Sequence, residues 1–167
     1  MLKEILSISG KPGLFKLISK GKNIFIAESL IDSKRIPVYS RDKVVSLGDI
    51  TMYSTDDDVR LAKILQSIKQ KENGEAISFS PSITNEDLRA YFSQVFPNFD
   101  RERVYPSDIK KVMNWYNLLV KSGLTDFEEE EENMPDGKGT KEPDEKEPDE
   151  DEKEIENNED DNTKKNK

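Results

Sequence analysis

The sequence predicts an α+β fold with a small N-terminal antiparallel β-barrel of the SH3-like or Sm-like type, a helical unit of about three helices, and a disordered acidic C-terminal tail. Between residues 14 and 54, short apolar runs alternate with turn residues, which is typical of short antiparallel strands. After Thr55 the apolar period lengthens to that of amphipathic helices. The predicted domains are therefore 1–55, 56–124 and 125–167.

Five apolar runs predict the strands of the barrel. They are separated by turn residues, such as Gly21 and Gly48, that allow the chain to reverse. Pro37 has no backbone N–H to donate, so we expect its run at an edge or a bend. The preceding LKEIL (2–6) could form one helical turn that plugs an end of the barrel. The five runs cover residues 14–19, 24–31, 35–40, 43–47 and 50–54.

Three amphipathic stripes, with apolar residues three and four positions apart, predict the helices. Thr55 or Asp56 is the expected cap of the first helix. Asp57 and Asp58 would then lie in its first turn, where the helix dipole favours negative charge. Thr84 is the expected cap of the second helix. The first helix ends at Asn73-Gly74, and the other two cover about 85–95 and 107–122.

The C-terminal part of the chain differs sharply in charge from the rest. Residues 126–167 hold 20 Asp and Glu against 7 Lys, whereas residues 1–125 hold 15 against 19 Lys and Arg, which together give the formal net charge of −9. The large apolar residues after residue 125 are only Phe127, Met134 and Ile155. So little apolar surface cannot offset the entropy of ordering the chain, so we expect disorder there.

The chain has no cysteine and no histidine. The first absence excludes disulfides, thiolate metal sites and thiol nucleophiles, and it suits a reducing compartment. The second removes the commonest general base and metal ligand. The sequence shows no signal-like segment and no apolar run long enough for a membrane span, so a soluble, cytoplasmic protein without a membrane partner is expected.

Three separated segments carry a family resemblance. They are LKEILSISGKPGLFKLISKGKNIFIAESL, RIPVYSRDKVVSLGDITMYS and RVYPSDIKKVMNWYNLL. These segments resemble an uncharacterised Bacteroidetes family known as a domain of unknown function. The resemblance covers residues 1–122 and leaves the acidic tail as a variable appendage. It implies no activity and transfers no catalytic residue.

The Gly10-Lys11 pair suggests a phosphate-binding P-loop, but the rest of that motif is missing. Ile5 stands in place of its first glycine, and Pro12 stands in place of the hydroxyl residue that holds Mg²⁺. A strand is also expected to follow, where a P-loop requires a helix. Gly10 and Gly13 are therefore interpreted as turn glycines.

The run Asp56-Asp57-Asp58 could be interpreted as a metal or acid/base cluster. Three consecutive side chains at a helix start diverge, so capping is the favoured interpretation. With no convergent acid pair in view, the sequence predicts no catalytic, metal or cofactor site, and an enzyme is not expected.

Two groups of residues are candidates for binding. Small barrels bind nucleic acid with cations beside aromatic rings, although a solvated barrel face would show the same surface lysines. The candidate basic patch consists of Lys16, Lys20, Lys22, Arg41 and Lys43, interleaved with Phe15, Phe25, Tyr39 and Tyr53. Trp115 either packs at the edge of the core or forms a recognition surface beside Lys110 and Lys111.

These observations favour a non-enzymatic binding or adaptor module that acts through contacts with an unidentified protein partner. The alternative is a nucleic-acid-binding small β-barrel modulated by its acidic tail, because a tethered polyanion would compete for a basic patch. The tail could instead serve only solubility. The oligomeric state is left open.

Overall fold

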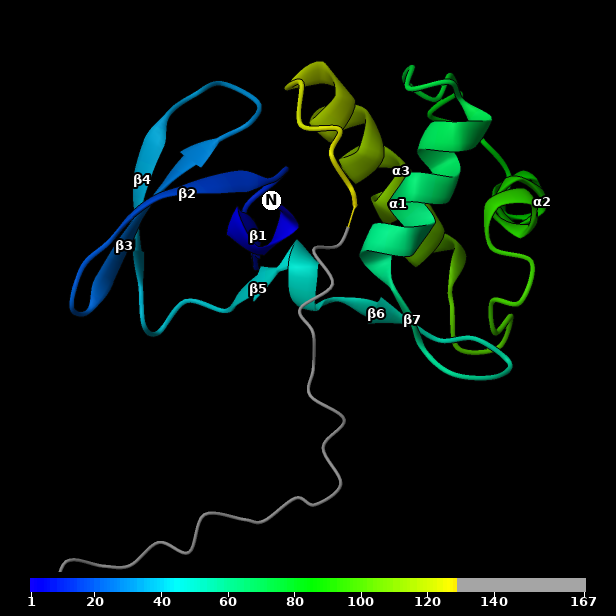
Figure 1. Ribbon diagram of the computed structural model, residues 1–167, viewed down its shortest axis with the longest axis horizontal. Coiled ribbons are helices and arrows are strands. Elements are labelled where there is room, and N and C mark those ends of the chain that lie inside the picture. The colour runs from blue at the N-terminus through cyan, green and yellow to red at the C-terminus, as the bar shows by residue number, and fades with distance from the viewer. Residues whose placement is uncertain (129–167) are drawn as a thin grey trace, which may run out of the picture. The chain divides into compact units, whose positions relative to one another are not determined.

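The computed structural model describes residues 1–128 (Figure 1). They form an α+β unit with an antiparallel sheet and three α-helices, which confirms the predicted fold class at this level. The acidic segment from residue 129 onward, for which we predict disorder, lies outside the described residues. The elements are η1 Leu2–Glu4, β1 Ile5–Ile8, β2 Phe15–Lys20, β3 Ile24–Ser29, β4 Arg35–Tyr39, β5 Val44–Ser46, η2 Leu47–Asp49, β6 Thr51–Met52, β7 Val59–Arg60, α1 Leu61–Lys71, α2 Asn85–Val95 and α3 Pro106–Lys121.

The main sheet has five antiparallel strands in the order β4-β3-β2-β1-β5. Its edge strands, β4 and β5, do not pair with each other within residues 1–128, so the sheet is open and the predicted closed barrel is not confirmed. The strand that contains Pro37 lies at an edge, as its missing N–H predicts. The register of β2 against β3 shifts between Leu17 and Ser19, which marks a bulge in β2.

The five strands of the sheet are not the five that the sequence predicts, because β1 takes the place of the predicted strand 50–54. Residues 2–6 do not form a helical plug, because only Leu2–Glu4 are helical and Ile5–Ile8 continue as β1, between β2 and β5. Ile5 packs into the core under the helices, whereas Leu6 and Ile8 pack into a smaller core on the sheet. The predicted strand 50–54 does not join this sheet, because Thr51 and Met52 pair with β7 in a separate two-stranded sheet.

The three predicted helices are confirmed, but the predicted cap of the first is wrong. Helix α1 begins at Leu61, with Arg60 at the N-cap position. Asp56 and Asp57 lie in the preceding β6–β7 turn, where the Asp56 N–H donates to the Ser54 hydroxyl. Thr84 caps α2 as predicted, because its hydroxyl accepts from the Asp87 N–H at 3.1 Å.

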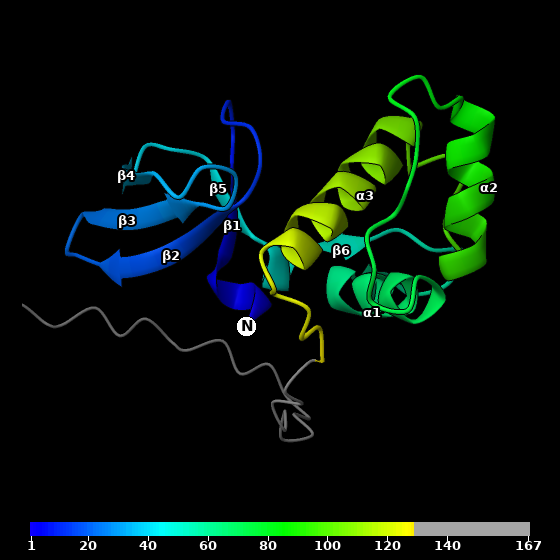
Figure 2. The ribbon, with the colours of Figure 1, turned by 90° about the horizontal axis from the view of Figure 1, so that it is seen from above.

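The sheet and the helices share one hydrophobic core. Leu2, Ile5, Leu14 and Leu47 from the N-terminal half pack in the same cluster as the buried stripes of α1, α2 and α3. Helix α3 lies between the sheet and α2 (Figure 2). The predicted domain boundary at residue 55 falls in the turn of the β6–β7 hairpin. The two halves are therefore joined by packing as well as by the chain.

Residues 122–128, the C-terminal strap, pack back onto the helices. The Phe127 side chain is 2% exposed, and its ring centroid lies 6.1 Å from that of Tyr116. The Leu124 N–H donates to the Leu119 carbonyl at 2.9 Å, and Lys69 Nζ donates to the Thr125 carbonyl at 2.9 Å. The packed part of the chain therefore extends past residue 125, where the sequence places the start of the tail.

Candidate binding groove

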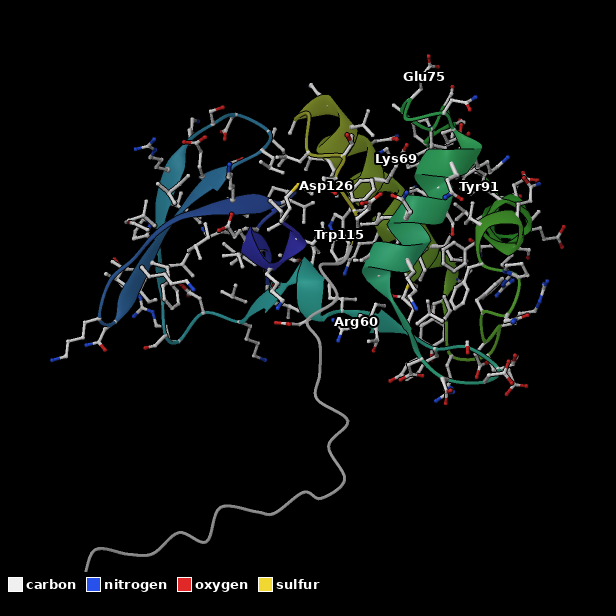
Figure 3. All side chains as sticks on the ribbon, in the orientation of Figure 1. Arg60, Lys69, Glu75, Tyr91, Trp115 and Asp126 are labelled. Atoms are coloured by element: carbon white, nitrogen blue, oxygen red, sulfur yellow. The ribbon has the colours of Figure 1, made fainter. Side chains whose placement is uncertain are left out.

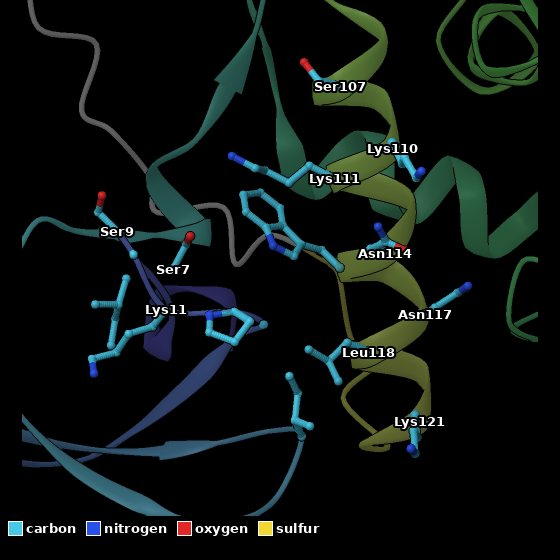
Figure 4. A pocket seen from close by; sticks show the side chains of 16 residues that line it. Ser7, Ser9, Lys11, Ser107, Lys110, Lys111, Asn114, Asn117, Leu118 and Lys121 are labelled. Atoms are coloured by element: carbon cyan, nitrogen blue, oxygen red, sulfur yellow. The ribbon is translucent and has the colours of Figure 1, made fainter. Parts of the chain in front are cut away.

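A groove of about 790 Å³ lies between the loop that joins β1 to β2 (residues 9–13) and one flank of α3 (Figure 4). It brings together two features that the sequence marks separately, the Gly-Lys loop and Trp115. The lining residues are Ser7, Ile8, Ser9, Gly10, Lys11, Pro12, Gly13, Ile31, Ser107, Lys110, Lys111, Asn114, Trp115, Asn117, Leu118 and Lys121.

The loop is held by a tight turn and one close packing contact. The Lys11 N–H donates to the Ile8 carbonyl at 3.1 Å, and Gly10 within this turn has φ +78. Gly13 also has φ +78, and a Cβ atom there would lie 2.5 Å from Ile31 Cδ1 and 3.5 Å from Leu118 Cδ2. Glycine at position 13 therefore lets the loop pack closely against Ile31 and α3.

The side chains of α3 divide into two groups. Lys111 and Leu118 extend toward the loop, whereas Lys110, Asn117 and Lys121 project from the other flank (Figure 4). Lys110 Nζ donates to the Pro81 carbonyl at 3.1 Å. The Asn117 side chain donates to the Ile77 carbonyl at 2.8 Å and accepts from the Ile77 N–H at 2.6 Å. Lys110 and Asn117 thus tie the connector between α1 and α2 to the flank of α3 that faces away from the loop.

Trp115 packs against the core with one part of its side chain and also lines the groove. Its side chain is half-buried and contacts the shared core, which agrees with packing at the edge of the core. It also lies on the side of α3 that faces the N-terminal strands (Figure 3), and Lys111 Nζ is 5.7 Å from its ring centroid. This cation–π arrangement places a positive charge over a surface that can contact an apolar or planar group.

The groove is basic. Lys11 and Lys111 come from its two sides, Lys110 and Lys121 add positive charge from the other flank of α3, and the described residues that line it include no carboxylate. Hydroxyl and amide groups of Ser7, Ser9, Ser107 and Asn114 add neutral hydrogen-bonding capacity. This composition suits an anionic ligand with an apolar or planar part.

The predicted basic patch does not coincide with the groove. Lys16 lies on β2 opposite Glu28, whose carboxylate also accepts from Arg35 at 3.0 Å. Lys20 ends β2, Lys22 lies in the β2–β3 turn, and Arg41 and Lys43 lie between β4 and β5. All five candidates are exposed, and none of them lines the groove.

The aromatic residues predicted beside this patch also separate. Phe15 is buried in the core on the sheet, and the Arg103 guanidinium lies 4.2 Å from the Tyr53 ring centroid. Phe25 and Tyr39 remain exposed on the sheet, and Arg41 lies 5.0 Å from the Tyr39 ring centroid. A smaller cationic and aromatic surface therefore remains around the β2–β3 and β4–β5 turns.

A second polar cluster joins α1 to α2. The Tyr91 hydroxyl donates to Glu72 Oε1 at 2.8 Å, and Lys71 Nζ lies 5.5 Å from the Tyr91 ring centroid. Burial and the bond to Glu72 raise the pKa of Tyr91 well above its usual value. Because its hydroxyl is bonded across two packed helices, we assign this cluster to helix packing.

Neither a cluster of metal ligands nor a membrane-spanning helix is found in the part of the chain that the structure describes. Within residues 1–128, no group of three or more acidic side chains is placed to hold a metal ion. In the same part of the chain, none of the helices has the length and apolar character needed to cross a membrane.

The chain is similar to known sequences of undefined function. Residues 2–47 match the family model described as domain of unknown function DUF5606, and residues 50–119 match domain of unknown function DUF6852. A solution NMR structure of a protein from Bacteroides vulgatus is 51% identical, with a TM-score of 0.63, over 76% of this chain and 91% of that chain. No curated protein matches the chain.

Proposed function

Because the chain belongs to an uncharacterised Bacteroidetes family built from two domains of unknown function, we propose its function from the groove itself: the protein is a non-enzymatic binding module that acts through protein contacts. The observation that carries this proposal is a groove with four lysines, a half-buried tryptophan and no carboxylate among its described lining residues. A partner that presents an acidic segment with an apolar side chain would complement these groups.

The groups in the groove support binding over catalysis. The chain has no histidine or cysteine, and the serines of the groove have no carboxylate beside them in its lining to act as a general base. The lysines and Trp115 can still attract, orient and contact a ligand. A cytoplasmic location is part of the proposal, and the absence of cysteine supports it.

The proposal also includes an SH3-like or Sm-like architecture for the N-terminal sheet. The position of β1 between β2 and β5, with a bulged β2 that continues into the β3–β4 meander, supports a strand arrangement like that of a small barrel with open edges. The packing of Leu2, Ile5 and Leu47 against the helices provides the cover that barrel closure would otherwise supply.

Binding of single-stranded nucleic acid is the second candidate. It is favoured by Lys111 over Trp115 and by Arg41 beside the exposed Tyr39, because bases stack on aromatic rings while cations contact phosphates. The acidic segment would modulate such binding by competition.

The single tryptophan makes the test direct, because Trp115 lines the groove and all tryptophan fluorescence comes from this one side chain. The packed unit ends near residue 130 and contains both cores, so a chain of residues 1–130 retains the folded part. It would be titrated with polyglutamate and, separately, with oligo-dT at low and moderate salt. We expect polyglutamate to change Trp115 fluorescence with an affinity that falls as salt rises.

Variants locate the binding. Lys11→Ala with Lys111→Ala is expected to weaken polyglutamate binding about five- to tenfold, since each exposed charge contributes up to about 1 kcal/mol. Lys63→Ala, an exposed lysine of α1 outside the groove, is the matched control and should bind as the parent does. If oligo-dT binds and polyglutamate does not, the ligand class is single-stranded nucleic acid and the proposal of an acidic protein partner fails. If neither polymer binds, the groove has no such function.

A further inference from the structure

We infer that in the free protein the groove binds the chain's own acidic segment, residues 129–167, so that an external acidic partner must displace it. This inference rests on the proposed function, because it names an occupant for the same groove. Three observations support it: the distribution of charge, the position where the strap ends, and the apolar residues within the segment.

The charges are complementary. Residues 129–167 contain 18 Asp and Glu against 7 Lys, whereas residues 1–128 contain 17 against 19 Lys and Arg. The folded part is thus close to neutral as a whole, and its groove gathers four lysines without a lining carboxylate. A polyanion attached to this unit is attracted to the groove more than to an average region of its surface.

The chain that follows the strap is long enough for the acidic segment to reach the groove. The strap ends beside Tyr116, and on a helix with 3.6 residues per turn Tyr116 lies roughly opposite Lys111 and Leu118. The acidic segment must therefore pass around α3, which with its side chains is about 10–12 Å wide. Since an extended chain spans about 3.3–3.6 Å per residue, about six residues cover half the circumference of the helix, roughly 16–19 Å, and about eight leave some slack. All residues from about 137 onward can then reach the groove.

Residues 141–155 are the part that fits best. They contain two copies of KEPDE followed by DEKEI, so carboxylates alternate with Pro143, Pro148 and Ile155. Trp115 and Leu118 offer the apolar contacts that these three side chains can use, while Lys11 and Lys111 supply positive charges that attract carboxylates. Proline-containing segments are well suited to aromatic-lined grooves because they have less conformational entropy to lose on binding.

A tethered ligand is a strong competitor. Attachment to the same chain gives the segment an effective concentration in the millimolar range, so even weak intrinsic binding keeps the groove occupied. External polyanions should therefore bind the full chain more weakly than residues 1–130. High salt should remove the difference, because it screens exposed charges beyond a few ångströms.

The experiment compares the full chain with residues 1–130 and needs no substitution in the folded part. Polyglutamate titrations followed by Trp115 fluorescence are expected to give an affinity at least tenfold weaker for the full chain at low salt. Quenching of Trp115 by acrylamide, a neutral quencher, should be weaker in the full chain, and the two chains should converge in about 1 M NaCl. A full chain in which the Asp and Glu of residues 141–154 are changed to Asn and Gln should behave as residues 1–130 do.

The outcomes separate this inference from the proposed function. If residues 1–130 bind polyglutamate and the full chain binds it equally well, the acidic segment does not occupy the groove, but the binding function stands. If residues 1–130 bind neither polymer, both ideas fail. Protection of Trp115 that rises with protein concentration would mean that a second copy supplies the segment, and it would overturn occupancy within one chain.

Discussion

Replacing Phe127 with alanine tests whether the strap is part of the folded unit. The side chain is 2% exposed, so its removal forfeits nearly the whole transfer free energy of a buried phenylalanine, about 2–3 kcal/mol. The cavity left beside Tyr116 adds to this loss, and core Phe→Ala changes cost about 3–5 kcal/mol in all. The strap can shift to fill part of the space, so we expect Phe127→Ala to lower the free energy of unfolding by about 3 kcal/mol.

The assay is urea unfolding of the full chain at pH 7, followed by far-ultraviolet circular dichroism. With a slope of about 1–3 kcal/mol per molar urea, the midpoint should fall by about 1–3 M. Phe25→Ala is the matched control, because the same ring is removed from a position that is 38% exposed, and its cost should be below about 1 kcal/mol. Equal, small effects of the two variants would show that Phe127 does not pack in the core. The strap would then not be part of the folded unit.

Three further predictions concern Gly13 in the β1–β2 loop, the Thr84 cap of α2 and the ionisation of Tyr91. Gly13→Ala should destabilise the protein by about 2 kcal/mol in urea unfolding, because the new methyl group meets Ile31 and the backbone has positive φ. Thr84→Ala should lower the melting temperature by a few degrees, since the cap of α2 contributes about 1 kcal/mol. The raised pKa of Tyr91 means that its stabilising effect is complete below the ordinary value near 10 and is lost as pH rises above it. Base titration should therefore lower the stability of the parent more steeply than that of Tyr91→Phe.

Each of these predictions has a matched control. Gly10→Ala shares the φ of +78 but has no atom within 4 Å of the new methyl group, so its cost should be the smaller one. Equal costs at positions 10 and 13 would show that the loop is not closely packed. Thr84→Ser keeps the capping hydroxyl and should keep most of the stability. Parallel pH profiles for the parent and Tyr91→Phe would contradict the burial of that hydroxyl.

Periodicity predicts the helices well because their apolar stripes face a core. Leu61, Ile64, Leu65 and Ile68 are almost fully buried in α1, and the hydroxyl of Thr84 makes the predicted cap. The predicted cap of α1, Thr55 or Asp56, is wrong because an acidic run before an apolar stripe can also form a turn. There the run closes the β6–β7 hairpin through Ser54.

The prediction misses strand β1 because its side chains are buried on both faces. Residues 5–8 bury side chains on both faces of the sheet, so they lack the alternation that marks a half-exposed strand. Phe127 is missed because it is a single apolar residue at the start of an acidic stretch, and composition averages over the whole stretch. Its burial depends on the position of Tyr116, which local sequence does not specify.

The groove could be predicted only as two separate parts. The sequence marks the Gly-Lys loop as a turn, and Trp115 beside Lys110 and Lys111 as a possible surface. About 100 residues separate the two, and they meet because Gly13 packs closely against Ile31 and Leu118. A contact of that kind depends on tertiary packing, which a single sequence does not reveal.

The shared core has a consequence for cooperativity. The two family models divide the chain between residues 47 and 50, yet Leu47 and Leu61 lie in one cluster with α2 and α3. Separating the matched segments would expose apolar surface on both, so neither segment should be stable without the other. Heat or urea should therefore unfold residues 1–128 in one transition, and the two sequence domains should behave as a single thermodynamic unit.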